Sequence, residues 1–293
     1  MPDITPQLVR HLLAEQFPQW AALPVTLVEP GGWDNRTFRL GDELSVRLPS
    51  AAGYAAQAEK EHRWLPHLQA GLPLAIPTSL ALGQPSDTFP WPWSVRRWLE
   101  GETASREAMH DDMELAETLA GVLAALQRID AADGPAAGEH NFYRGAPLQV
   151  YDAETRQAIQ TLQRQIDVPS ALGVWEMALG TVWPGPPVWV HGDVAAGNLL
   201  LRGGKLSAVI DFGCCAVGDP ACDLVMAWTF FAGTSRKAFQ AALPLDDDTW
   251  SRARGWALWK ALITVANPTE APAKASEARR VLAEVLSDPV APK

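Results

Sequence analysis

Two short segments carry the side chains best suited to chemistry. The first, HGDVAAGN, runs from 191 to 198, and the second, IDFG, runs from 210 to 213. Asp193 lies in the first segment, where an ionised carboxylate would be able to accept a proton from a substrate hydroxyl group. An isolated aspartate of this kind is more often a turn residue bonded to its own backbone. The neighbouring residues therefore decide between the two interpretations.

A glycine pair at 203–204 predicts a two-residue hairpin turn between these segments. In that hairpin Asn198 would lie opposite Val209, two residues before Asp211. The turn would thus bring a carboxamide and a carboxylate together at the open end of one hairpin. Mg²⁺ prefers such hard oxygen ligands and completes its shell with water and phosphate. The sequence therefore predicts a magnesium site at this hairpin.

HGDVAAGNLL followed by IDFG resembles the catalytic and metal-binding segments of the aminoglycoside phosphotransferase family, which includes choline kinase-like and other small-molecule kinases. The resemblance is strongest over residues 188–231 and extends more weakly over 28–101. It implies a two-lobed protein-kinase-like fold, Mg²⁺, and ATP as the phosphoryl donor, with GTP not excluded. It also implies Asp193 as the catalytic base, and Asn198 and Asp211 as the Mg²⁺ ligands.

The resemblance also places the nucleotide between the two lobes. The loop that covers the phosphates corresponds to five consecutive residues, Gly31, Gly32, Trp33, Asp34 and Asn35. Glycines let the backbone approach phosphate oxygens closely, although an ordinary hairpin can also contain two of them. A Walker-type loop is excluded, because the only Gly-Gly-Lys sequence, at 203–205, is followed by leucine where serine or threonine is required.

Arg47 occupies the position at which relatives usually have a phosphate-binding lysine. Arginine stays charged and can bond phosphate bidentately, but its fork is wider and less mobile than an ammonium group. The departure therefore bears on nucleotide affinity and identity. The partner glutamate on the following helix would be Glu61, with Glu59 as the alternative. The linker between the lobes, whose backbone would meet the adenine edge, corresponds to Arg97, Trp98 and Leu99.

Other interpretations stay open. The departure at Arg47 would suit a catalytically silent nucleotide-binding homologue. A metal-dependent hydrolase is a third interpretation. It is weakened because His191 is the only histidine near the carboxylates. The resemblance implies that His191 shapes the catalytic loop and does not bind a metal.

The acceptor site has two candidates in the sequence. One is the acidic start of a helix (Glu107, Asp111, Asp112 and Glu114), which would otherwise be a solvated helix face. The other is the aromatic run 228–231, which would otherwise belong to the core. A cationic aminoglycoside-like antibiotic would suit both candidates and would give the protein a role in antibiotic resistance. The sequence does not identify the acceptor.

These residues need elements that position them. Hydrophobic spacing predicts helices over 5–17, 55–68, 105–129, 151–166 and 277–286, and strands over 24–29, 36–40, 44–47, 94–99, 188–190, 199–202 and 205–210. Gly41-Asp42 predicts a two-residue hairpin, and Pro66 a kink or stop. The bunched strands predict an α+β fold with a small, mostly β lobe at 1–100, which includes the hinge, and a larger, mostly helical lobe at 101–293.

Two aspartates near the second segment have structural interpretations. Asp219 precedes Pro220, and together they predict the start of a helix. Asp223 would make a polar contact that supports the catalytic loop.

The 293-residue chain has a net charge of −10 and 47% hydrophobic residues, which excludes a disordered protein and is typical of a packed one. The acidic balance argues against a nucleic-acid partner, and no apolar run approaches the roughly 20 residues of a membrane span. Three clustered cysteines match neither a disulfide framework nor zinc spacing, and no secretory signal is expected. We therefore expect a cytoplasmic protein whose partners are a nucleoside triphosphate and a small hydroxyl-bearing substrate.

Overall fold

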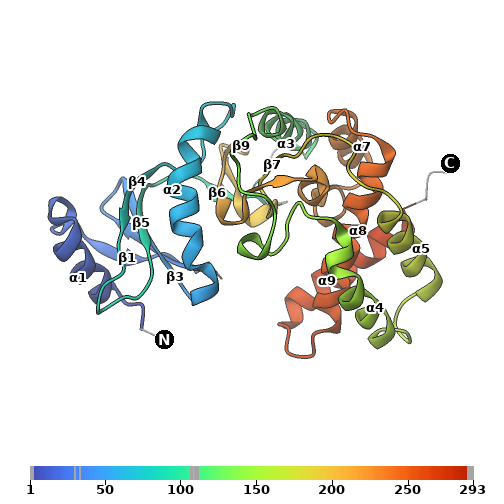
Figure 1. Cartoon of the computed structure of the whole chain (residues 1–293), viewed down its shortest axis with the longest axis horizontal. Coiled ribbons are helices and arrows are strands. Elements are labelled where there is room, and N and C mark those ends of the chain that lie inside the picture. Colours follow the sequence, from blue (N-terminus) through green and yellow to red (C-terminus); the bar gives the residue numbers. More distant parts are fainter. Residues whose placement is uncertain (1–2, 30, 33, 106–107, 109–111, 289–293) are drawn as a thin grey trace.

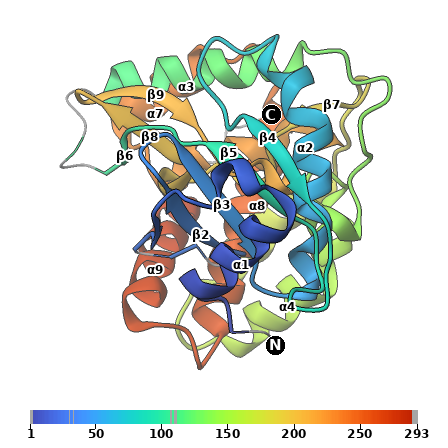
Figure 2. The ribbon, with the colours of Figure 1, turned by 90° about the vertical axis from the view of Figure 1, so that its left-hand side faces the viewer.

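The computed structural model describes residues 3–29, 31–32, 34–105, 108 and 112–288. Its N-terminal part is a five-stranded antiparallel sheet in the order β1-β2-β3-β5-β4 (Figures 1 and 2). The strands are β1 (Val25–Leu27), β2 (Asn35–Leu40), β3 (Leu44–Pro49), β4 (Ser79–Gly83) and β5 (Trp93–Arg97). Two helices accompany this sheet, α1 (Pro6–Gln16) and α2 (Ala55–Gln69).

The alternation of side chains along β3 and β5 gives the sheet two different faces. Val46 and Val95 lie in the buried cluster that also contains Leu12 of α1, so this face is apolar. Arg47 and Arg96 alternate with these residues and therefore lie on the opposite face. That face is turned toward α2, and it is the one that carries charge.

Helix α2 contacts both parts of the molecule. It passes through Pro66 without ending there, and its Leu65 and Leu68 belong to the C-terminal hydrophobic cluster. Lys60 Nζ donates to His140 Nδ1 at 3.0 Å, and the ring centroids of Trp64 and Trp189 are 5.1 Å apart. The helix is therefore anchored in the C-terminal part along its length.

The C-terminal part is mainly helical and contains two small sheets (Figure 1). Its strands are β6 (Glu102–Thr103), β7 (Val188–Val190), β8 (Leu199–Arg202), β9 (Lys205–Val209) and β10 (Ala216–Gly218). Its helices are α3 (Asp112–Gln127), α4 (Asp152–Thr161), α5 (Val168–Leu179), α6 (Met226–Thr229), α7 (Gly233–Ala241), α8 (Asp247–Ala266) and α9 (Pro272–Ser287). Sheet β6-β8-β9 and the pair β7-β10 position the loops that carry the chemistry.

Several expected elements differ in detail. The turn between β2 and β3 has three residues, because Leu40 pairs with Leu44, and Gly41 takes a φ of 58°. Strand β4 and helix α5 were not predicted from the sequence. Helix α4 ends at Thr161, and α5 begins separately after Asp167, whose side chain accepts from Ser170 N at 3.2 Å.

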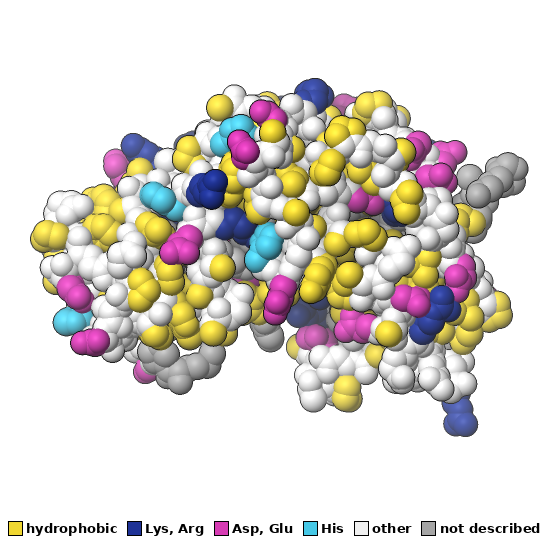
Figure 3. All heavy atoms as spheres, in the orientation of Figure 1, with side chains coloured by type: hydrophobic (Ala, Val, Ile, Leu, Met, Phe, Trp, Pro, Cys, Tyr) yellow, Lys and Arg dark blue, Asp and Glu magenta, His cyan; other side chains and the backbone are white. Residues whose placement is uncertain are grey.

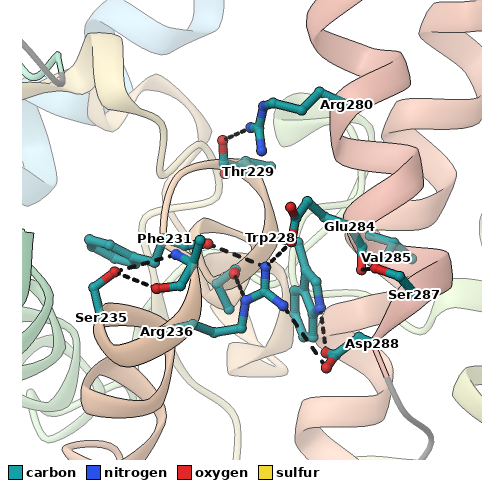
Figure 4. A network of polar contacts seen from close by, with 12 residues as sticks. Trp228, Thr229, Phe231, Ser235, Arg236, Arg280, Glu284, Val285, Ser287 and Asp288 are labelled. Atoms are coloured by element: carbon teal, nitrogen blue, oxygen red, sulfur yellow. Dashed lines mark hydrogen bonds and ion pairs between the residues drawn. The ribbon is translucent and has the colours of Figure 1, made fainter.

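The aromatic run 228–231 is structural, and Figure 4 shows how it is held. Trp228 is 2% exposed, and its Nε1 donates to Asp288 Oδ2 at 2.8 Å. Arg236 of α7 donates to Glu284 Oε2 at 2.5 Å, and Arg280 donates to the Thr229 carbonyl at the same distance. These contacts fasten α9 to α6 and α7, and Trp228 and Phe231 belong to the core.

The buried side chains form two hydrophobic clusters. One joins α1 to the five-stranded sheet, and the other fills the C-terminal part and includes the end of α2. The boundary at residue 100 stays a prediction. On the face shown in Figure 3, acidic and basic side chains are interspersed and form no broad basic stripe. In the described part of the chain, every helix is too short or too polar to cross a membrane.

A buried ion pair connects α8 to the segment after β10. Arg252 Nε donates to Asp219 Oδ2 at 2.6 Å, and Asp219 also caps the short helix at Pro220–Leu224, as expected. We predict that Asp219→Asn lowers the free energy of unfolding by about 3 kcal/mol, because it leaves a buried guanidinium without its counter-charge. Urea denaturation measures the change. Glu176→Gln removes an exposed ion pair with Arg156 and serves as the control; an equal effect in both variants would contradict the prediction.

Candidate active site

The 191–198 loop joins β7 to β8 and lies directly against the segment that follows β9. Gly192 has a φ of 81°, and a Cβ atom there would lie 2.4 Å from the Cys214 carbonyl oxygen. Glycine is therefore required on two grounds, the left-handed conformation and the close approach. This contact sets the spacing between the two chemistry-bearing segments.

Asp223 holds the start of the loop from below. Its Oδ2 accepts from His191 N at 2.6 Å and its Oδ1 accepts from Gly192 N at 2.8 Å. The side chain is 1% exposed, and burial raises the pKa of its carboxyl group. The expected supporting contact is thus present, and it fixes the backbone immediately before Asp193.

His191 links the two segments through its ring. Nε2 lies 2.9 Å from the Ile210 carbonyl oxygen, and Nδ1 lies 3.2 Å from Asp193 N. These partners assign the ring proton to Nε2, because Nδ1 must accept. The ring is buried and meets Phe212 edge-on, with centroids 4.6 Å apart. His191 therefore holds the loop in shape, as expected, between Asp193 and the residue before Asp211.

Asn198 and Asp193 are in direct contact. Asn198 Nδ2 donates to the Asp193 carbonyl oxygen at 2.8 Å and to its Oδ2 at 3.1 Å. Asp193 is exposed, so its carboxylate is accessible. Because Nδ2 is the donor in both bonds, the carbonyl oxygen Oδ1 of Asn198 is left to accept or to bind a cation.

The hairpin register differs from the expected one by one residue. A bulge at Ser207 shifts the pairing, so Leu200 lies opposite Ala208 but Leu201 opposite Leu206. Ile210 N donates to the Asn198 carbonyl oxygen at 2.9 Å. Asn198 therefore lies opposite Ile210 rather than Val209, one position nearer to Asp211 than predicted.

Asp211 forms an ion pair with Arg47 from the sheet. Arg47 Nη2 lies 3.0 Å from Asp211 Oδ1. Although burial alone would raise the pKa of Asp211, the positive charge and hydrogen bond of Arg47 hold it below its ordinary value. The backbone of Asp211 takes a φ of 68°, a conformation that non-glycine residues rarely adopt and that occurs often at functional sites.

Glu61 lies between two arginines. It is 1% exposed and receives a bidentate pair of bonds from Arg96, with Nη1 at 3.0 Å and Nη2 at 2.7 Å. Arg47 Nη1 lies 3.7 Å from Glu61 Oε1. The structure therefore brings Glu61 to Arg47, while Glu59 is exposed. Arg96 was not predicted at the site, although strand alternation places it on the same face as Arg47.

The loop before β2 lies close to the carboxylates. Trp33 is outside the described residues, and Gly31 and Gly32 are exposed. Asp34 Oδ2 accepts from Gln57 Nε2 at 3.1 Å, and Asn35 Nδ2 donates to Gln57 Oε1 at 3.4 Å.

Burial raises the pKa of Asp34, and the negative charges of Asp211 and Asp193 add to this effect. The structure thus brings the end of this loop within electrostatic range of Asp193, Asp211 and Arg47.

The linker residues lie at the end of β5. Arg97 N donates to Thr78 O at 3.0 Å and Trp98 N donates to Glu43 O at 2.7 Å. The Trp98 ring lies under Arg39, whose Cζ is 4.2 Å from the ring centroid. Because these two N–H groups are engaged, only the N–H group of Leu99 in this linker is left to donate to a nucleotide base.

The hydrolase interpretation requires a metal cluster. Among the described residues, no three or more His, Cys, Asp or Glu side chains gather closely enough to hold a metal ion by themselves. A cation at this site would therefore need the amide oxygen of Asn198 and ligands from a substrate.

Solved structures show the same fold at low sequence identity. The aminoglycoside 2'-phosphotransferase-IIIa in its GDP complex aligns with a TM-score of 0.70 and 19% identity over 97% of this chain and 99% of that chain. The macrolide 2'-phosphotransferase MphH from Brachybacterium faecium aligns with a TM-score of 0.61 and 24% identity over 96% and 98%. The APH(2")-IIa ternary complex with streptomycin and ATP aligns with a TM-score of 0.59 and 18% identity over 98% and 99%.

These alignments confirm the protein-kinase-like fold, with an antiparallel sheet followed by a helical part. No match was found among curated proteins. Residues 26–256, which include both chemistry-bearing segments, match the phosphotransferase enzyme family. The chain belongs to this phosphotransferase family.

Proposed function

We propose that this protein transfers the γ-phosphoryl group of ATP to a hydroxyl group of a small molecule. The observation that carries the proposal is the convergence of Asp193, Asn198, Asp211 and Arg47 at the junction of the sheet with the helical part. Such a set can position a hydroxyl group, a cation and a triphosphate together. Because relatives are known in complexes with GDP and with ATP, GTP stays open as the donor.

Asp193 would act as the base. Asn198 Nδ2 holds Asp193 Oδ2 at 3.1 Å, which leaves Oδ1 to accept the proton of an acceptor hydroxyl group. His191 and Asp223 fix the backbone on which this carboxylate is mounted. Phosphoryl transfer depends mainly on positioning and charge stabilisation, so rigid placement of the base is the contribution expected of the protein.

The donor atoms fit a magnesium ion. Asn198 Oδ1 and the Asp211 carboxylate are hard oxygen ligands on adjoining segments, and the pKa of Asp211 is held low, so its carboxylate is ionised. When bound there, Mg²⁺ would neutralise charge on the phosphate oxygens.

Arg47 has one guanidinium nitrogen near Glu61 and another on Asp211, which directs the group toward the proposed phosphate position. Gly31, Gly32, Asp34 and Asn35 would cover the phosphates, and Leu99 would meet the base.

The acceptor is not fixed by these comparisons. Relatives include enzymes named for aminoglycosides and for macrolides, all at 24% identity or less. A catalytically silent homologue, the second candidate, is favoured only by arginine at position 47.

A cytoplasmic location agrees with three buried free thiols, and burial raises the pKa of Cys214 and of Cys215 to about 12.

We predict that Asp193→Asn lowers kcat by at least about a hundredfold, because the amide cannot accept the hydroxyl proton. The Kd for ATP should stay within a few-fold, since the substitution is nearly isosteric. Coupled ADP release and calorimetric ATP titration measure the two quantities. Asp87→Asn, an exposed aspartate, is the control. Near-normal turnover in Asp193→Asn would refute its role, and ATP binding without transfer in the unaltered protein would favour the silent homologue.

We predict that Asp211→Ala abolishes both activity and the Mg²⁺ dependence of ATP binding. The variant removes one of two proposed protein ligands and also frees Arg47. Calorimetric ATP titrations at several Mg²⁺ concentrations test this directly. If the titration curves shift with Mg²⁺ as in the unaltered protein, Asp211 is not a ligand.

We predict that Arg96→Gln raises the KM for ATP about tenfold, which is the effect of one charge-assisted hydrogen bond. Without Arg96, Glu61 would be left with Arg47 and would draw it away from Asp211. Arg10→Gln, on the exposed side of α1, provides the matched control. An unchanged KM in a folded Arg96→Gln protein would show that Arg47 keeps its position without this support.

A further inference from the structure

A loop over residues 138–146 lies beside the proposed base and takes no part in the function argued so far. Phe142 and Tyr143 have φ values of 53° and 54°, so two consecutive non-glycine residues are left-handed. Asn141, which is fully buried, accepts from Gly138 N at 2.9 Å and donates to the carbonyl oxygens of Arg144 and Cys214 at 2.8 and 3.1 Å. Strain that the surroundings hold in place in this way is typical of functional sites.

The contact with Cys214 places this loop next to the reaction centre. The Cys214 carbonyl group that accepts from Asn141 also lies against Gly192, the residue that precedes Asp193. On its other side, the Phe142 ring lies 6.0 Å from the ring of Tyr54, which belongs to the N-terminal part. Phe142 and Tyr143 are 40% and 39% exposed. The loop therefore presents two aromatic side chains where the two parts of the molecule meet.

A layer of buried aromatic rings supports the loop. Tyr151 stacks on Trp259 with centroids 3.9 Å apart and an interplanar angle of 25°. The Tyr151 hydroxyl donates to the Phe142 carbonyl oxygen at 2.6 Å. Trp259 Nε1 donates to Glu154 Oε2 at 2.7 Å, which fixes the indole in turn. The rings thus form a rigid platform against which the loop packs.

Two cations lie on this aromatic platform. Arg144 Cζ is 4.8 Å from the Trp259 ring centroid and 5.3 Å from that of Trp256, and Lys260 Nζ is 5.8 Å from that of Trp259. Within the ranges that the structure describes, neither cation has a carboxylate oxygen within ion-pair distance. An arginine that lies over aromatic rings without an acid partner keeps its fork available for a planar anion.

Both acidic and basic groups surround these two cations. Burial and the positive charge of Arg144 lower the pKa of Lys260, and Asp193 opposes the shift, so the two cations and the proposed base lie within electrostatic range. Lys274 and Glu154 also act on Lys260. The Glu154 carboxylate accepts from the Trp259 indole and the Asp193 carboxylate from Asn198. Both acids keep their charge but are directed at these partners, so among the described residues Arg144 and Lys260 have no acid paired directly with them.

We propose that the acceptor carries an anionic group, a carboxylate or a phosphate, which Arg144 and Lys260 bind while Phe142 and Tyr143 contact its apolar part. This inference rests on the phosphotransferase function proposed above. A bidentate, charge-assisted bond to Arg144 would orient the hydroxyl group toward Asp193. A polycationic acceptor would instead meet two like charges beside the base, which disfavours it.

The reaction keeps the anionic group unchanged. The acceptor hydroxyl oxygen forms a bond to the γ-phosphorus, and the bond from that phosphorus to the β,γ-bridging oxygen breaks. ADP leaves with the electron pair of that bond, and the hydroxyl proton passes to Asp193. The products are ADP and a phosphate ester that still carries its carboxylate or original phosphate.

The test is a charge-sorted acceptor screen by coupled ADP release. The panel contains amino sugars and aminoglycosides as cations, sugars and polyols as neutral compounds, and sugar acids and sugar phosphates as two separate anionic groups. We expect the highest kcat/KM in one anionic group, and the better of the two identifies the anion. With that acceptor, Arg144→Gln and Lys260→Gln should each raise the acceptor KM roughly tenfold to a hundredfold. The KM for ATP should stay within about threefold of the parent, because neither cation contacts the nucleotide in this proposal.

Matched controls separate binding from folding. Arg164→Gln and Lys237→Gln remove exposed cations elsewhere and should leave the acceptor KM unchanged. Arg144→Lys should recover part of the lost affinity, which a purely structural role for the guanidinium would not give. Transfer confined to cationic or neutral acceptors, or an unchanged acceptor KM in both Gln variants, overturns the inference and leaves the phosphotransferase function standing. ADP release with no group of the panel counts against that function itself.

Discussion

A single buried carboxylate, Glu61, has to balance two guanidinium groups, and the arrangement of the site depends on that balance. Arg96 takes both oxygens of Glu61 in bidentate bonds, while Arg47 reaches the same carboxylate only at 3.7 Å and Asp211 at 3.0 Å. Because one acid cannot satisfy two buried cations, Arg47 needs the second acid from the C-terminal part. The charges therefore alternate from β5 through α2 and β3 to the end of β9. This alternation aligns the sheet with the loop that carries Asp211. It also shows how an arginine at position 47 can pair with Asp211 while Glu61 pairs mainly with Arg96.

The other half of the site is held by backbone rather than by charge. Asp223 bonds two successive N–H groups, His191 bridges Asp193 to Ile210, and Gly192 lets Cys214 approach. None of these groups needs to touch a substrate. Together they make the position of Asp193 a consequence of the fold, so the reactive side chains are mounted on a pre-organised frame.

Local patterns in the sequence predicted the fold class, the proximity of the two motifs and most of the elements. The motifs at 191–198 and 210–213 lie against each other, as expected, and the predicted protein-kinase-like fold is confirmed. The predicted register of the hairpin was wrong by one residue, because a bulge leaves no local signature in an apolar strand. Arg96 was not predicted at the site, although the apolar residues at 93 and 95 mark the other face of that strand. The loop at 138–146 was missed entirely, since its left-handed residues are aromatic and are held by tertiary contacts.

The seating of α2 has a mechanical consequence. Lys60, Trp64 and His67 all bond or pack against residues of the C-terminal part, at His140, Trp189 and the Asp130 carbonyl. Helix α2 is thereby fixed to the larger body, while polar contacts at Gln57, Glu61 and His62 join it to the sheet. If the sheet swings to admit or release a nucleotide, the sliding plane runs between sheet and helix. Arg47 and Arg96 would then move with the sheet while Glu61 and His62 stay with the helix, so opening would break the polar contacts between them.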